Sequence, residues 1–151
     1  MRILQSHADF IEFEPTQKEI PLAEDAEKKK YRYEDAVVLF ISVEEGDDEF
    51  IGKKAIDDVK EFLSKVKDNK IIIYPFAHLS RNLAKPDNAL KIVKGMESYA
   101  KKLKIETYRA PFGWTKKMAI QIKGHPLAET AKIYTPEDVK TEIKKPVIRK
   151  T

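Results

Sequence analysis

Apolar positions follow two periods along the chain, and each period predicts a type of element. Residues 3–6 and 10–13 alternate between apolar and polar side chains, as two short strands do. Residues 36–43 form a continuous apolar run rich in β-branched side chains, which is typical of a strand covered on both faces. Residues 70–74 predict another buried strand.

Two later segments instead carry apolar residues at steps of three and four, which predicts amphipathic helices. The first spans 56–66 and the second spans 90–103, with Pro86 and Asp87 as a suitable start for the second. The apolar positions are Ile56, Val59, Phe62, Leu63 and Val66 in the first helix, and Leu90, Val93, Met96, Ala100 and Leu103 in the second. The order strand, helix, strand, helix indicates an α/β layer.

The pattern changes after residue 105. Residues 116–123 alternate as a strand, Gly124-His125-Pro126 interrupts them, and residues 131–134 alternate again. Residues 14–34 are charged and proline-containing, which favours a solvated loop. Residues 136–151 show little apolar periodicity and are interpreted as a linker.

Composition narrows the class of protein. Charged residues make up 36% of the 151 residues, with a formal net charge of +4, which tolerates a polyanionic partner without requiring one. Cysteine is absent, so disulfides and thiolate metal sites are excluded. No apolar stretch approaches the 18 residues of a membrane span, so a cytoplasmic protein with no membrane partner is expected.

Three polar residues stand where chemistry is expected. His78 follows a buried strand and precedes a helix, the place where ligands bind in open sheets, although an inert surface histidine fits equally well. Lys116 has the parity of the apolar face of its strand, and Glu129 has that of Ala131. Each is either a snorkelling side chain or a group held in a cleft.

Other chemistries lack their motifs. His7, His78 and His125 are widely separated, so no metal site is predicted, and the five glycines form no phosphate-binding loop. The residues alone therefore predict an α/β domain with a His–Lys–Glu candidate cleft.

Several blocks resemble a known family, the N-terminal editing domain of archaeal-type threonyl-tRNA synthetase. They are MRILQSHADFIEFE at 1–14, FISVE at 40–44, YPFAHLS at 74–80 with LAKP at 83–86, APFGWTKK at 110–117 and GHPLAE at 124–129. The resemblance implies a fold like that of D-aminoacyl-tRNA deacylase: an α/β (α+β) mixed sheet or partial barrel with two main helices packed on it. It also implies an editing domain at 1–135 and a linker at 136–151 leading to a synthetase core.

The resemblance further implies a function, which is hydrolysis of L-serine from tRNA for threonine. Carried over by motif, His78, Lys116 and Glu129 are the functional side chains, and main-chain groups around Val43, Ala77 and Phe112 bind the aminoacyl-adenosine end. The family needs no cofactor in this domain, is assisted by the terminal 2′-hydroxyl of the tRNA, and is expected to form a homodimer.

Two features depart from a simple transfer. A tyrosine precedes the motif lysine in the family, whereas this chain has Thr115, whose shorter hydroxyl leaves only a binding role. A tight hairpin around Gly124 places Glu129 about 20 Å from Lys116 at ~3.3 Å per residue, so we expect the 124–129 region to differ from a simple hairpin.

Two alternatives stay open at this point. One is a free-standing D-aminoacyl-tRNA deacylase, against which the linker-like tail counts. The other is a module that docks tRNA without catalysis, for which the modest positive charge is sufficient.

Overall fold

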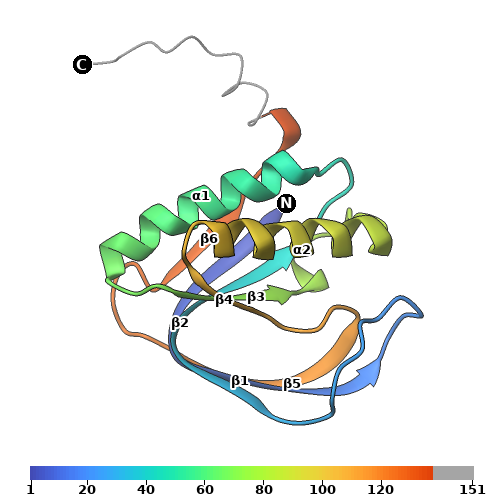
Figure 1. Cartoon of the computed structure of the whole chain (residues 1–151), viewed down its shortest axis with the longest axis horizontal. Coiled ribbons are helices and arrows are strands. Elements are labelled where there is room, and N and C mark those ends of the chain that lie inside the picture. Colours follow the sequence, from blue (N-terminus) through green and yellow to red (C-terminus); the bar gives the residue numbers. More distant parts are fainter. Residues whose placement is uncertain (138–151) are drawn as a thin grey trace.

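The computed structural model describes residues 1–137 as an α+β fold with one six-stranded sheet and two long helices (Figure 1). The strand β1 is the longest and lies inside the sheet. In chain order the elements are β1 (Arg2–Lys18), β2 (Tyr31–Ser42), α1 (Glu49–Val66), β3 (Lys70–Pro75), the short 3₁₀ turn η1 (Ala77–Leu79), α2 (Pro86–Lys102), β4 (Glu106–Arg109), β5 (Trp114–Ile122) and β6 (Glu129–Ile133).

The sheet is mixed and open, and a mixed sheet is what the family resemblance implied. Its strands lie in the order β4-β3-β2-β1-β5, and β6 also pairs with β1. β2, β3 and β4 are parallel, with α1 and α2 as the crossover connections, while β1 pairs antiparallel with β2, β5 and β6. β5 and β6 therefore follow each other along one edge of β1.

The two predicted helices are confirmed and form one layer over the sheet (Figure 1). Asp48 caps α1 by accepting from the Ile51 N–H at 3.0 Å, and Pro86 stands in the first turn of α2. The main core lies between this layer and the sheet, and a smaller cluster lies on the other face of the sheet. Strand β2 is consequently buried from Ala36 to Ser42, as its continuous apolar run predicted.

The prediction of two short strands before residue 14 is wrong, because they are one strand with a bulge. The pairing register of β1 with β5 shifts between Ala8 and Phe10, which leaves Asp9 unpaired in that ladder. The extra residue reverses the side-chain parity, so Ala8 and Ile11 both belong to the smaller cluster. In the sequence, the interrupted alternation of apolar and polar residues looks like the end of a strand, although the strand continues through the bulge.

The prediction of a loop over residues 14–34 is also too broad. β1 extends to Lys18 and β2 begins at Tyr31, so only residues 19–30 connect them. The predicted linker lies almost entirely in residues 138–151, outside the described residues. Within residues 1–137, no helix is long and apolar enough to cross a membrane.

Candidate active site

A cavity of about 340 Å³ opens where the carboxyl end of β3 meets the start of α2 and the segment leading into β5. Six of the seven residues that the sequence nominated line it together, and Glu129 does not. The six are Val43, Ala77, His78, Phe112, Thr115 and Lys116. The fold thus brings together groups up to 73 positions apart, since 116 − 43 = 73.

Lys116 projects from β5 toward the cavity and is held from three sides. Its Nζ donates to the carbonyl oxygens of Pro111 at 3.0 Å and Trp114 at 3.2 Å, and lies 5.0 Å from the centre of the Tyr74 ring. A lysine held by two main-chain carbonyls and an aromatic face has lost most of its rotamer freedom. The geometry therefore differs from that of a lysine that snorkels to solvent.

The surroundings also change the acidity of this amine. Burial lowers the pKa of Lys116 to about 8, and the nearby Glu19 and Glu24 carboxylates oppose this shift only in part. An amine with a pKa near 8 exchanges its proton close to neutral pH, which suits proton handling or the stabilisation of a developing negative charge.

His78 lies in η1, directly after β3, at the rim of the cavity. Its side chain is exposed, and its ring packs edge-on against Phe76 with the ring centres 4.9 Å apart. The Ser42 hydroxyl donates to the Phe76 carbonyl and accepts from the Leu79 N–H at 3.2 Å, so it binds both ends of the turn. The backbone around His78 is thereby fixed while the imidazole remains free to meet a ligand.

A partly buried ion pair supports the segment that carries Phe112. Arg109 donates to both carboxylate oxygens of Glu24 and, through Nε, to Glu97 at 2.8 Å. Glu24 also accepts from the Phe112 N–H at 2.9 Å, and its own N–H donates to the Phe112 carbonyl at 3.0 Å. Although burial opposes ionisation, these donors hold the pKa of Glu24 below its usual value.

These contacts restrict the main-chain groups that a ligand can use. The Phe112 N–H is already committed to Glu24, and the Val43 carbonyl accepts from the Ala84 N–H at 3.0 Å. A ligand at the Phe112 N–H would therefore have to displace Glu24, whereas the Val43 carbonyl keeps a second lone pair. The Thr115 hydroxyl donates to Glu19, which also lines the cavity.

Comparison with known proteins identifies the family. The sequence model described as the archaea-specific editing domain of threonyl-tRNA synthetase matches residues 1–133. The chain belongs to this family.

Relatives of the editing domain agree with that assignment. A threonine–tRNA ligase of Nitrosopumilus maritimus is 48% identical over 136 residues, which are 89% of this chain and 22% of the relative. A threonine–tRNA ligase editing subunit of Saccharolobus solfataricus is 46% identical over 132 residues, 87% of this chain and 34% of the relative. The chain thus spans only a fifth to a third of the length of these proteins.

The fold also recurs in a protein of very different sequence. The c-Myc DNA unwinding element binding protein superposes with a TM-score of 0.67 at 6% identity, covering 89% of this chain and 99% of that one. At this identity the similarity concerns the fold alone.

Glu129 is the nominated residue that the editing domain does not place in the cavity. The expectation that the 124–129 region is not a simple hairpin is confirmed, because β6 pairs with β1 and not with β5. Glu129 lies opposite Ser6 and Lys116 lies opposite Pro15, which are nine positions apart along β1 (15 − 6 = 9). The role of Glu129 stays a prediction, and a shared site within one chain has no geometric support.

Sequence reasoning missed the residues that support the site. Ser42 stands inside the FISVE block and Tyr74 inside YPFAHLS, so the quoted motifs contained both without assigning them a role. Glu24 and Arg109 are 85 positions apart, and no local pattern links them. Among residues 1–137, no group of three His, Asp or Glu side chains is placed to hold a metal ion.

Proposed function

We propose that the domain hydrolyses the ester bond of seryl-tRNA for threonine in the cavity at the end of β3. The observation that carries the proposal is the convergence of the partly buried Lys116 and the exposed His78 on one cavity in a member of this editing family. The lining of the cavity is mostly apolar with a few polar groups, as is usual for sites that bind small molecules.

In the proposed reaction, water adds to the ester carbonyl carbon and the bond to the ribose oxygen breaks. The ribose oxygen takes up a proton, and serine and the tRNA are released. The Lys116 ammonium supplies a fixed hydrogen-bond donor to the attacking water or to the oxyanion that develops. His78 contacts the aminoacyl-adenosine end, and the 2′-hydroxyl of the tRNA takes part in proton transfer.

Editing is needed because serine differs from threonine by one methyl group. One missing methylene changes binding in an apolar pocket by only about 1–3 kcal/mol, which limits the accuracy of the synthetic site. An editing pocket has the simpler task of excluding the larger amino acid. Walls made of main chain suit this task, since they have no rotamers with which to make room.

The first prediction concerns this selectivity. Under single-turnover conditions the domain should deacylate seryl-tRNA for threonine at least about 10-fold faster than the threonyl form, because one methyl group must collide with the wall. The measurement is release of labelled amino acid from the two charged tRNAs with enzyme in excess. Equal rates would contradict the editing assignment and favour a general deacylase, and binding without turnover would favour a docking module.

A further inference from the structure

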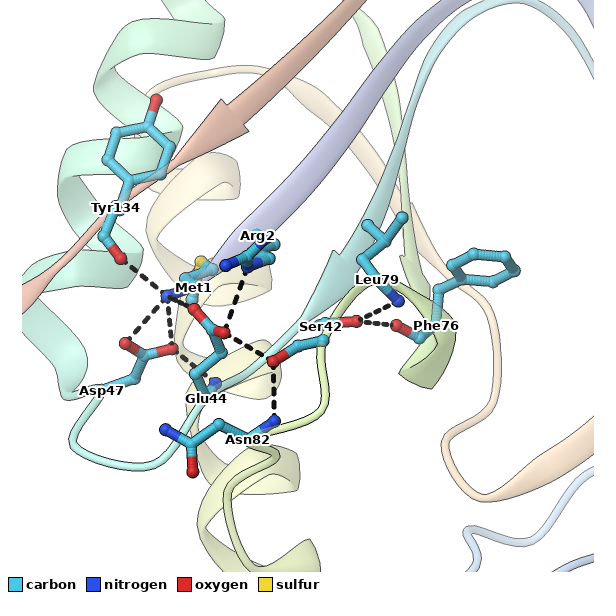
Figure 2. A network of polar contacts seen from close by, with 10 residues as sticks. Met1, Arg2, Ser42, Glu44, Asp47, Phe76, Leu79, Asn82 and Tyr134 are labelled. Carbon is cyan, nitrogen blue, oxygen red and sulfur yellow. Dashed lines mark hydrogen bonds and ion pairs between the residues drawn. The ribbon is translucent and has the colours of Figure 1, made fainter.

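The N-terminal ammonium group is buried in a polar network that extends to the turn carrying His78 (Figure 2). Met1 is 1% exposed, and its nitrogen lies 3.0 Å from Glu44 Oε1, 3.0 Å from Asp47 Oδ1 and 2.7 Å from the Tyr134 carbonyl oxygen. An ammonium has three N–H groups and here meets three acceptors, two carboxylates and one carbonyl, so its burial is offset by hydrogen bonds and opposite charge.

Glu44 connects the Met1 ammonium to Ser80, which follows the turn that carries His78. Its Oε2 accepts from the Ser80 hydroxyl at 2.5 Å and from Arg2 Nε at 3.3 Å, so each carboxylate oxygen faces a different part of the chain. Asp47 fixes the Glu44 backbone by accepting from its N–H at 2.7 Å. Burial raises the pKa of Asp47. Burial also opposes ionisation of Glu44, but hydrogen bonds from Ser80 and the N-terminal ammonium outweigh it and lower the pKa of Glu44.

Ser80 is the first residue after η1. Its Oγ accepts from the Asn82 N–H at 3.0 Å, which fixes the chain as it leaves the turn. The Ser42 hydroxyl fixes the same turn from inside, through Phe76 and Leu79 (Figure 2). The exposed His78 thus stands between two anchored points.

We propose that Glu44, fixed by the ammonium of Met1, is a positioning residue for His78 and acts through Ser80. The proposal rests on the hydrolytic role given to His78 above. A displacement of about 1 Å at a catalytic centre costs up to about 100-fold in rate, so a hydroxyl that holds the turn can govern the rate without touching the substrate.

A double-mutant cycle tests this link. Ser80→Ala should lower the single-turnover deacylation rate constant at saturating enzyme about 10-fold or more, and Ser80→Thr, which keeps the hydroxyl, should restore most of it. The decisive variant is Ser80→Ala combined with His78→Ala. If Ser80 acts through His78, the double variant is no slower than His78→Ala alone.

Controls separate the positioning role from general stability. Ser64→Ala removes an exposed helix hydroxyl that binds only the Glu61 carbonyl, and should change neither the rate nor the melting temperature. Glu44→Gln and a chain with one glycine added before Met1 should both speed amide exchange at Leu79 and Asn82. That readout does not depend on activity, so it tests the network even if the substrate assignment fails.

Three results would overturn the proposal. The first is a Ser80→Ala effect that multiplies with that of His78→Ala, which would mean that the two residues act independently. The second is unchanged amide exchange in Glu44→Gln. The third is a folded His78→Ala variant with wild-type rate, since the turn would then carry no functional group. If Ser80→Ala does not fold, Glu44→Asp replaces it in the cycle, because it keeps the charge and shortens its reach.

Discussion

At the scale of single residues, the site depends on what surrounds Lys116. The two carbonyls that hold its Nζ, those of Pro111 and Trp114, belong to the same sequence block as the lysine, and the Tyr74 ring comes from β3. The alternation of β5 predicted that Lys116 lies on the inward face, and the structure confirms this placement. The lowered pKa could not be predicted, because it results from burial in the folded chain.

The second prediction is that Lys116→Met keeps the fold and loses editing. Methionine retains the apolar stem and removes the charge, so the melting temperature should change little. Losing one donor to a developing oxyanion costs about 2.7–4 kcal/mol, or roughly 100- to 1000-fold in rate. The measurement is single-turnover deacylation of seryl-tRNA, with thermal melting as the check of folding. Lys117→Met, at the exposed neighbouring position, is the matched control.

The third prediction uses the pKa of Lys116, which is about 8. If the ammonium is the active form, its population falls as the pH rises through 8, and the advantage of wild type over Lys116→Met should fall with it. Taking the ratio of the two rates removes the hydroxide-driven hydrolysis that both proteins share. A ratio that increases from pH 7 to pH 9 would instead identify the neutral amine as a base.

At the scale of elements, the sequence predicted the regular parts and missed those set by pairing. The helices α1 and α2 and the strands β2 and β3 carry uninterrupted periodicity, and all four were predicted. The bulge at Asp9 split β1 into two predicted strands. β4 has four residues, of which only Thr107 is buried, so its sequence shows no apolar pattern. Its place in the sheet depends on its pairing with β3.

The connection between β5 and β6 is held in place by hydrogen bonds of His125. The Leu127 N–H donates to His125 Nδ1 at 3.1 Å, so the proton of a neutral His125 is on Nε2 and is donated to His7 Nδ1 at 2.8 Å. His7 in turn donates from Nε2 to Asp68 Oδ2 at 2.5 Å. This chain of bonds ties the connection to the end of α1 through β1.

The fourth prediction follows from that chain of bonds. His125→Ala should lower the free energy of unfolding by about 1–3 kcal/mol, because it leaves a nitrogen of the buried His7 without its partner. Urea unfolding measures the loss. His78→Ala is the matched control and should be close to neutral, since His78 is exposed. Equal stabilities of the two variants would show that the bond to His7 contributes nothing net.

At the scale of the whole molecule, the core closes on residues near both ends of the described chain. Tyr134 is 7% exposed, belongs to the main core, accepts from the Met1 ammonium and donates through its hydroxyl to Asp58 Oδ2 at 2.7 Å. β6 lies beside the first residues of β1, from Arg2 to Ser6. The editing fold therefore needs the chain at least as far as Tyr134, which the alternation of residues 131–134 includes.

The fifth prediction is that a chain ending at Glu137 folds and edits as the full 151-residue chain does, whereas a chain ending at Ala128 does not. The shorter cut removes β6 and Tyr134, which exposes part of the main core and leaves the Met1 ammonium without one of its acceptors. Each kcal/mol lost lowers the melting temperature by about 2–8 °C, so the two cuts should differ by well over 5 °C. Calorimetry of both chains, together with deacylation by the longer one, checks this. If the chain ending at Glu137 melts far below the full chain, residues beyond it contribute to the fold. If the chain ending at Ala128 melts as high as the full chain, the anchoring of the N-terminal ammonium by Tyr134 is not part of what holds this domain together.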